Sequence, residues 1–307
     1  MAARAATLRR AIARRFPVHL PFLIPFFALV VSFFFIPVLL NIFLAFTDMD
    51  YKLQWELVGL RSYFKLFKDP LIPKIMKNTA IYVSCTLAIN VLFGFLLALL
   101  TTYYVKSETT GLIFRAFWML PRMTPPVVYV LLWLWLFDPT DYGLLNMILK
   151  DLFGMPPQNW LLNYPMAAVI LINGMIGASF GMIIFSAAIK SIPPDYIMAA
   201  QVDGASNFGI VFKIILPLLK WPIMFVTAWQ IISLLESYEY ILLTTGGGPF
   251  HKTEVWSLFA YNKAFTAQQY GYGAAIAMIQ VVISAIAALT VLKIFGFRRL
   301  MELARGA

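Results

Sequence analysis

A run of 28 residues without a charged side chain, between His19 and Asp48, limits most strongly how this chain can fold. A helix needs only about 20 apolar residues to cross the hydrocarbon core of a bilayer, which is about 30 Å thick. The run is longer than that core requires, so we expect it to form a membrane helix that tilts or bends, with Pro37 as the expected bend.

The composition of the whole chain indicates the same class of protein. Of its 307 residues, 61% are hydrophobic and 12% are charged, and the mean hydropathy is +0.80. Soluble domains carry about 25% charged residues. We therefore predict an all-α polytopic membrane protein with six transmembrane helices, at about 20–46, 79–104, 114–137, 165–189, 222–243 and 272–292. A basic segment over 1–18, a membrane domain over 19–297 and a short tail over 298–307 complete the predicted organisation.

The basic residues predict how the chain is oriented. If the N-terminus lies in the cytoplasm, 14 lysines and arginines fall in cytoplasmic segments and nine in outer ones, as the positive-inside rule favours. Both termini and the loop over 191–220 are then cytoplasmic. The net charge of +10 follows from this topology and from attraction to anionic membrane lipid, so it predicts no nucleic-acid partner.

The predicted outer loop over 48–77 contains a second pattern. Leu60, Tyr63, Phe64 and Phe67 recur at helical spacing, which predicts an amphipathic helix with these residues on its apolar face.

The cytoplasmic loop over 191–220 is longer than a reversal of direction requires. Pro193 and the proline after it favour a helix start, and we predict a short helix over about 195–202. Gly204 allows a sharp turn where a side chain would clash. Ser206 or Asp203 can then cap a second helix, which Pro217 ends or kinks. We expect two short helices that meet at a bend and offer a docking surface to a partner.

This loop resembles the coupling loop of permease subunits of binding-protein-dependent ABC importers. The family pattern runs from Glu-Ala-Ala through Asp-Gly-Ala to an apolar helix that ends in Leu-Pro. The matching residues here are Ala199, Ala200, Asp203, Gly204, Ala205, Phe208 and Pro217. Met198 replaces the family's acidic residue, and Asp195, about one helical turn earlier, is the expected partial substitute. The segment over 243–249 resembles a turn of permeases for sugars and glycerol phosphate.

The resemblance implies the fold of a type I ABC importer permease in a prokaryotic inner membrane. It implies a second homologous permease subunit, two ATPase subunits that bind ATP and Mg, and an extracytoplasmic substrate-binding protein. Import of a sugar, an oligosaccharide or a related polyol by alternating access would follow. The three glycines at 246–248 are not followed by Gly-Lys-Ser or Gly-Lys-Thr, so they form no phosphate-binding loop. We therefore expect no enzymatic activity, cofactor or metal in this chain.

Polar residues within the apolar runs are the candidates for a substrate pathway, because charges there are costly and usually face a cavity or a partner. Arg122 lies among prolines that should break the third run. Glu236 and Glu239 are expected to share one face of the fifth helix, with tyrosines between and beside them. Acids and aromatic rings together suit sugars. The candidates are Arg122, Asn173, Glu236, Tyr238, Glu239 and Tyr240.

Other interpretations of these residues remain open. Arg122 can form a structural ion pair with Glu236 or Glu239, or the glutamates can lie hydrated at the outer interface. The glycines that follow Asn173 favour close helix packing. A secondary transporter, driven by an ion gradient and binding a proton or cation at the glutamates, is the alternative function. However, the chain has no obvious inverted repeat, and that function leaves the 191–220 loop unexplained. A membrane scaffold without a pathway fits poorly with charges inside the runs.

Overall fold

The computed structural model describes residues 20–296, and this part of the chain is built from helices. Within it, the only β contact is an isolated bridge between Thr47 and Leu57. The predicted segments over 1–18 and 298–307 lie outside the described residues. Four helices within the described residues are long and apolar enough to cross a membrane, and up to six spans result there if each of two bent helix pairs counts as one.

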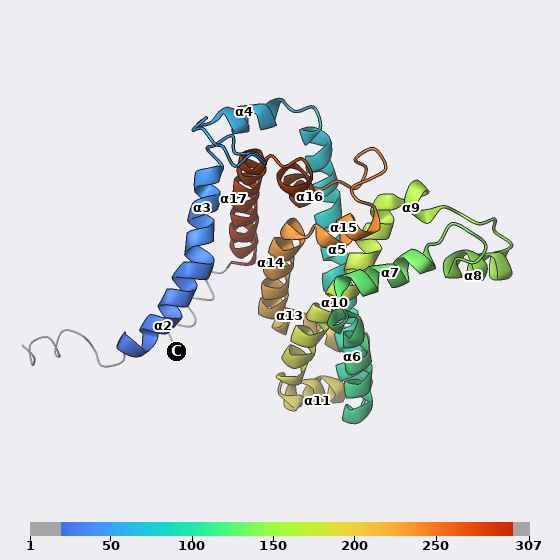
Figure 1. Ribbon diagram of the computed structural model, residues 1–307. Coiled ribbons are helices and arrows are strands. Elements are labelled where there is room, and N and C mark those ends of the chain that lie inside the picture. The colour runs from blue at the N-terminus through green and yellow to red at the C-terminus, as the bar shows by residue number, and fades with distance from the viewer. Residues whose placement is uncertain (1–19, 297–307) are drawn as a thin grey trace, which may run out of the picture.

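The first apolar run forms α2 (Leu20–Val30), a π-helical turn η1 (Val31–Phe35) and α3 (Ile36–Leu44). The irregular turn lies directly before Pro37, which stands at the start of α3. A proline removes an amide donor from the turn that precedes it, so the irregularity falls before the proline. Figure 1 shows α2 and α3 at one edge of the molecule, with α17 (Tyr270–Phe295) beside α3.

The predicted amphipathic helix is present as α4 (Arg61–Lys68), but its buried face differs from our prediction. Phe64 and Phe67 are 64% and 70% exposed. Leu66, between them in sequence, is fully buried in a cluster with Ile75 and Trp256. The helix therefore packs through Ser62 and Leu66, with Tyr63 half-buried, and leaves Phe64 and Phe67 facing outwards, because packing against α17 selects the face.

The core of the described chain is the pair formed by α5 (Ile72–Leu99), which continues through η2 (Leu100–Tyr104), and α10 (Pro165–Lys190). Glycines let the two backbones approach, as predicted for the run after Asn173. A Cβ atom placed on Gly177 would lie 2.4 Å from Oδ1 of Asn90, and one on Gly94 would lie 2.7 Å from the carbonyl oxygen of Ala178. Neither position has room for a side chain.

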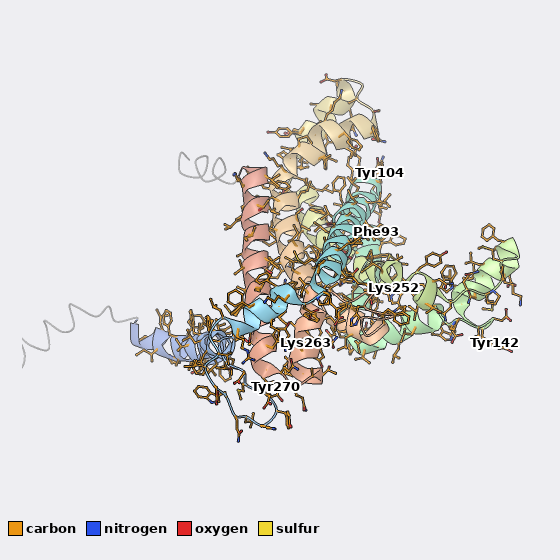
Figure 2. All side chains as sticks on the ribbon, turned by 90° about the horizontal axis from the view of Figure 1, so that it is seen from above. Phe93, Tyr104, Tyr142, Lys252, Lys263 and Tyr270 are labelled. Carbon is orange, nitrogen blue, oxygen red and sulfur yellow. The ribbon has the colours of Figure 1, made fainter. Side chains whose placement is uncertain are left out.

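The third apolar run is broken, as its prolines predict. α6 (Glu108–Met123) and α7 (Pro126–Leu136) meet at an angle of 99°. After α7 the chain continues through α8 (Leu144–Phe153) and α9 (Trp160–Asn163). In both views α8 stands away from the bundle, and Figure 2 shows Tyr142 near the tip of this arm.

The chain after α10 bends repeatedly. It forms α11 (Pro194–Val202), α12 (Asn207–Ile210), a π-helical turn η3 (Val211–Ile215), α13 (Leu216–Leu218), α14 (Lys220–Glu236) and α15 (Glu239–Thr244). The fifth run is therefore not one helix. α14 ends at Glu236, and Ser237 is extended, so the prediction that Glu236 and Glu239 share one helix face is wrong.

Three segments complete the described fold: α16 (Trp256–Tyr261), a π-helical turn η4 (Asn262–Thr266) and α17 (Tyr270–Phe295). α17 packs against both α14 and α3. Figure 1 shows α11 at the end of the molecule opposite α4 and α16. The loop over 191–220 and the loop over 48–77 thus lie at opposite ends of the bundle, as the predicted topology requires.

Candidate functional site

The loop between α10 and α14 folds into short helices around one tight turn. The amide of Gly204 donates to the carbonyl oxygen of Gln201 at 3.1 Å, and that of Ala205 donates to the carbonyl oxygen of Ala200 at 2.9 Å. Ser206 caps α12 by accepting a hydrogen bond from the amide of Gly209. Gly204 has a φ of +78°, in the left-handed region, which glycine adopts without strain.

The reason for a glycine at the bend differs from our prediction. A Cβ atom added to Gly204 would meet no atom within 4 Å, so a side chain would clash with nothing nearby. The requirement comes from the positive φ angle, which costs an L-residue roughly 1–2 kcal/mol.

One side of this loop is anchored in the core. Ile210, Val211 and Ile215 are buried in a cluster with Ala98 of α5 and Phe185 of α10. The loop therefore cannot shift without moving the ends of the two central helices, because the interior is close-packed.

The opposite side of the loop is apolar and exposed. Met198 is 52% exposed, Phe208 69% and Val202 88%. Asp195 lies three residues before Met198 on α11, so the two residues occupy neighbouring positions on the helix surface. Both side chains are exposed. The remaining predicted coupling residues also lie on this loop, with Ala200 half-buried and the others exposed: Ala199, Ala200, Asp203, Ala205 and Pro217.

A polar pocket of about 270 Å³ lies at the break between α6 and α7. Three of the predicted pathway residues line it, from three different elements: Arg122, Asn173 and Tyr240. α14 contributes Gln230 and Ser233, and Ser237 follows directly after that helix. The pocket is therefore enclosed by both helices that flank the 191–220 loop.

The wall of this pocket is held by buried hydrogen bonds. The side-chain amide of Asn173 donates to the hydroxyl of Tyr82 and, at 3.0 Å, to that of Ser237. The amide of Gln230 donates to the carbonyl oxygen of Gly177 at 3.0 Å. These bonds fix α14 and the chain after it against α5 and α10.

The other predicted pathway residues are placed elsewhere. Glu236 and Tyr238 line a larger, mostly apolar cavity of about 690 Å³ between α3, α14, η4 and α17. Glu239 lines neither cavity and is exposed. Within residues 20–296 neither glutamate forms an ion pair with Arg122, and no group of three or more potential metal ligands occurs there.

Sequence analysis did not select the polar residues of α14. Gln230 and Ser233 lie three residues apart in a mostly apolar stretch of α14, and Ser237 follows four residues later, directly after the helix ends, a spacing that is typical of one helix face. This polar stripe was the signal that could have identified them.

The chain matches the family described as "binding-protein-dependent transport system inner membrane component" over residues 90–298. A probable ABC transporter permease protein of Pyrococcus horikoshii is 31% identical over 86% of this chain and 90% of its own length. The trehalose/maltose transport system permease protein MalF of Thermococcus litoralis is 28% identical over 90% of this chain and 93% of its own.

A solved structure shares the fold. The crystal structure of a bacterial ABC transporter involved in the import of the acidic polysaccharide alginate contains a chain that superposes with a TM-score of 0.81, at 24% identity, covering 95% of this chain and 99% of that one. With a family match over most of its length, the chain belongs to the binding-protein-dependent transport system inner membrane components, the membrane-spanning permease subunits of ABC importers, which have no enzymatic activity of their own.

Proposed function

We propose that this chain forms half of the translocation pathway of an ATP-driven importer for a sugar, an oligosaccharide or a related polyol. Similarity to the trehalose/maltose permease supports the substrate class. The chemistry of the polar pocket agrees with it, since hydroxyl, amide and aromatic groups line it together. Such groups bind the hydroxyls and the apolar faces of sugar rings.

The observation that carries this proposal is the connection between the loop and the pocket. α10 enters the 191–220 loop and α14 leaves it, and both helices line the polar pocket. A partner that moves the exposed surface of Met198, Val202 and Phe208 therefore moves two walls of the pocket. The loop is thus a coupling element. Its movement changes the positions of the pocket's walls, and this change produces alternating access.

The expected partners are those of the family. Of two ATPase subunits, which bind ATP and Mg, one docks on the exposed loop surface of this chain, and the other docks on a second homologous permease that completes the pathway. An extracytoplasmic binding protein delivers substrate at the opposite end, where α4 and α16 lie (Figure 1). The apolar outer faces contact membrane lipid. Both termini are cytoplasmic, and the membrane domain extends over about 19–297.

The test is uptake by the assembled importer in proteoliposomes, with labelled neutral and anionic disaccharides as probes. We expect uptake that requires ATP on the side of the 191–220 loop and the binding protein on the other. Uptake driven by a proton or sodium gradient without ATP would contradict the proposal.

A matched pair of variants tests the coupling surface. Phe208→Ala should lower ATP-dependent uptake and co-purification of the ATPase. Phe64→Ala removes a similarly exposed ring, 64% against 69% exposed, from the opposite end of the molecule. It should leave ATPase co-purification unchanged. Equal loss in both variants would show that Phe208 is not a specific docking residue.

A further inference from the structure

Arg122 gives the polar pocket a positive charge. Among residues 20–296 it is the only charged side chain that lines the pocket. Its guanidinium carbon lies 5.7 Å from the ring centroid of Phe180, and within residues 20–296 it forms no ion pair with a carboxylate. A charge within a membrane-spanning segment is costly and usually faces a cavity or a partner. The guanidinium of Arg122 lines this pocket, where it can bind an anion that enters.

The rest of the pocket has groups that can hold a sugar ring beside this charge. Phe180 and Trp229 are stacked, with ring planes 25° apart and centroids separated by 6.2 Å, and Trp229 is 55% exposed. Ser233 and Tyr240 also line the pocket, and each adds a hydroxyl group. The nearby Glu236 belongs to the other cavity, so no carboxylate of the lining opposes the positive charge.

We propose that the importer carries an anionic sugar, one with a carboxylate or phosphate group, and that Arg122 binds this group. The inference rests on the proposed function and specifies its substrate class. A planar guanidinium forms paired hydrogen bonds with either a carboxylate or a phosphate. The aromatic surface of Trp229 then takes the apolar face of the sugar. Arg122 acts as a specificity residue, because a neutral sugar does not balance its charge.

The experiment compares uptake of three labelled probes by the assembled importer in proteoliposomes: a neutral disaccharide, the same disaccharide with a terminal uronic acid, and its phosphate ester. Arg122→Gln removes the charge and Arg122→Lys keeps it. Co-purification of the second permease and the ATPase is measured for each variant. The two anionic probes distinguish a carboxylate from a phosphate substrate.

We expect the wild-type importer to take up at least one anionic probe. Arg122→Gln should lower that uptake by about tenfold or more, the effect of losing a hydrogen bond between charged groups. Arg122→Lys should retain a larger share, and the ratio of anionic to neutral uptake should fall in Arg122→Gln.

Four results would overturn the inference. Uptake of the neutral probe without either anionic one would leave the proposed function intact but remove the anionic substrate. An equal decrease for all probes in Arg122→Gln would make Arg122 a general structural residue. Loss of the second permease from that variant would assign Arg122 to a subunit contact. If none of the probes is taken up when ATP and binding protein are present, the result would count against the proposed sugar importer as well.

Discussion

The side-chain amide of Asn173, in the first half of α10, donates a hydrogen bond of 3.0 Å to the hydroxyl of Ser237, the extended residue between α14 and α15. The hydroxyl of Ser237 also lies 3.1 Å from that of Tyr82 on α5. Three segments that are far apart in sequence are therefore joined at one buried point beside the polar pocket. This junction fixes the end of α14 against α5 and α10.

Asn173→Leu should destabilise this junction. Leucine keeps the branching of the side chain but removes the amide donor, so the hydroxyls of Tyr82 and Ser237 keep only the hydrogen bond to each other, and each lost hydrogen bond costs about 0.5–1.5 kcal/mol. We expect a lower unfolding temperature of the purified complex in detergent, with reduced uptake. Asn163→Leu, the same change at an exposed position on α9, is the control. Equal unfolding temperatures for the two variants would show that the junction contributes no stability.

Gly204→Leu should uncouple the ATPase from transport. The left-handed φ of +78° is strained for L-residues such as leucine, so the bend between α11 and α12 should open and misdirect the exposed surface. Membrane insertion should be preserved, because the loop lies outside the apolar runs. The measurements are ATP hydrolysis and uptake in the same proteoliposomes. Gly209→Ala, within the helical part of the loop, is the control, and normal uptake in Gly204→Leu would refute the coupling assignment.

Met198→Glu should leave the complex assembled. The residue is exposed, and glutamate there restores the acidic position of the family pattern. Asp195, three residues earlier, adds a like-charge repulsion of only about 0.2–0.5 kcal/mol. Pull-down of the ATPase with the permease measures the effect. Severe loss of the ATPase would mean that its docking groove is apolar around Met198.

Glu239→Gln should change transport and stability little. In the described chain Glu239 is exposed, forms no ion pair and lies outside the polar pocket. Its carboxylate stands in the first turn of α15, where the helix dipole contributes about 0.3–1 kcal/mol. Uptake kinetics and unfolding temperature are the measurements, with Tyr240→Phe as the comparison inside the pocket. A large loss of uptake in Glu239→Gln, with normal stability, would return this residue to the pathway.

Local patterns in the sequence were sufficient for several features. The prolines around Arg122 predicted the break between α6 and α7, and Gly204 with Ser206 predicted the turn and cap of the 191–220 loop. Glycine spacing after Asn173 predicted the close packing of α10. Each of these depends on backbone chemistry of a few neighbouring residues: a missing amide donor, an allowed positive φ, or the absence of a Cβ atom.

The polar pocket depends on contacts between segments that are distant in sequence. The sequence did not reveal these contacts. The spacing of Glu236 and Glu239 predicted one shared helix face, yet α14 ends between them and the two carboxylates separate. The aromatic stripe of α4 predicted the buried face, yet Leu66 is buried instead. The sequence by itself determined a helical membrane protein with a sharply bent loop over 191–220, because apolar length and turn chemistry are local properties. Only the tertiary structure decided which polar residues meet in one pocket, because that depends on how α5, α10 and α14 pack together.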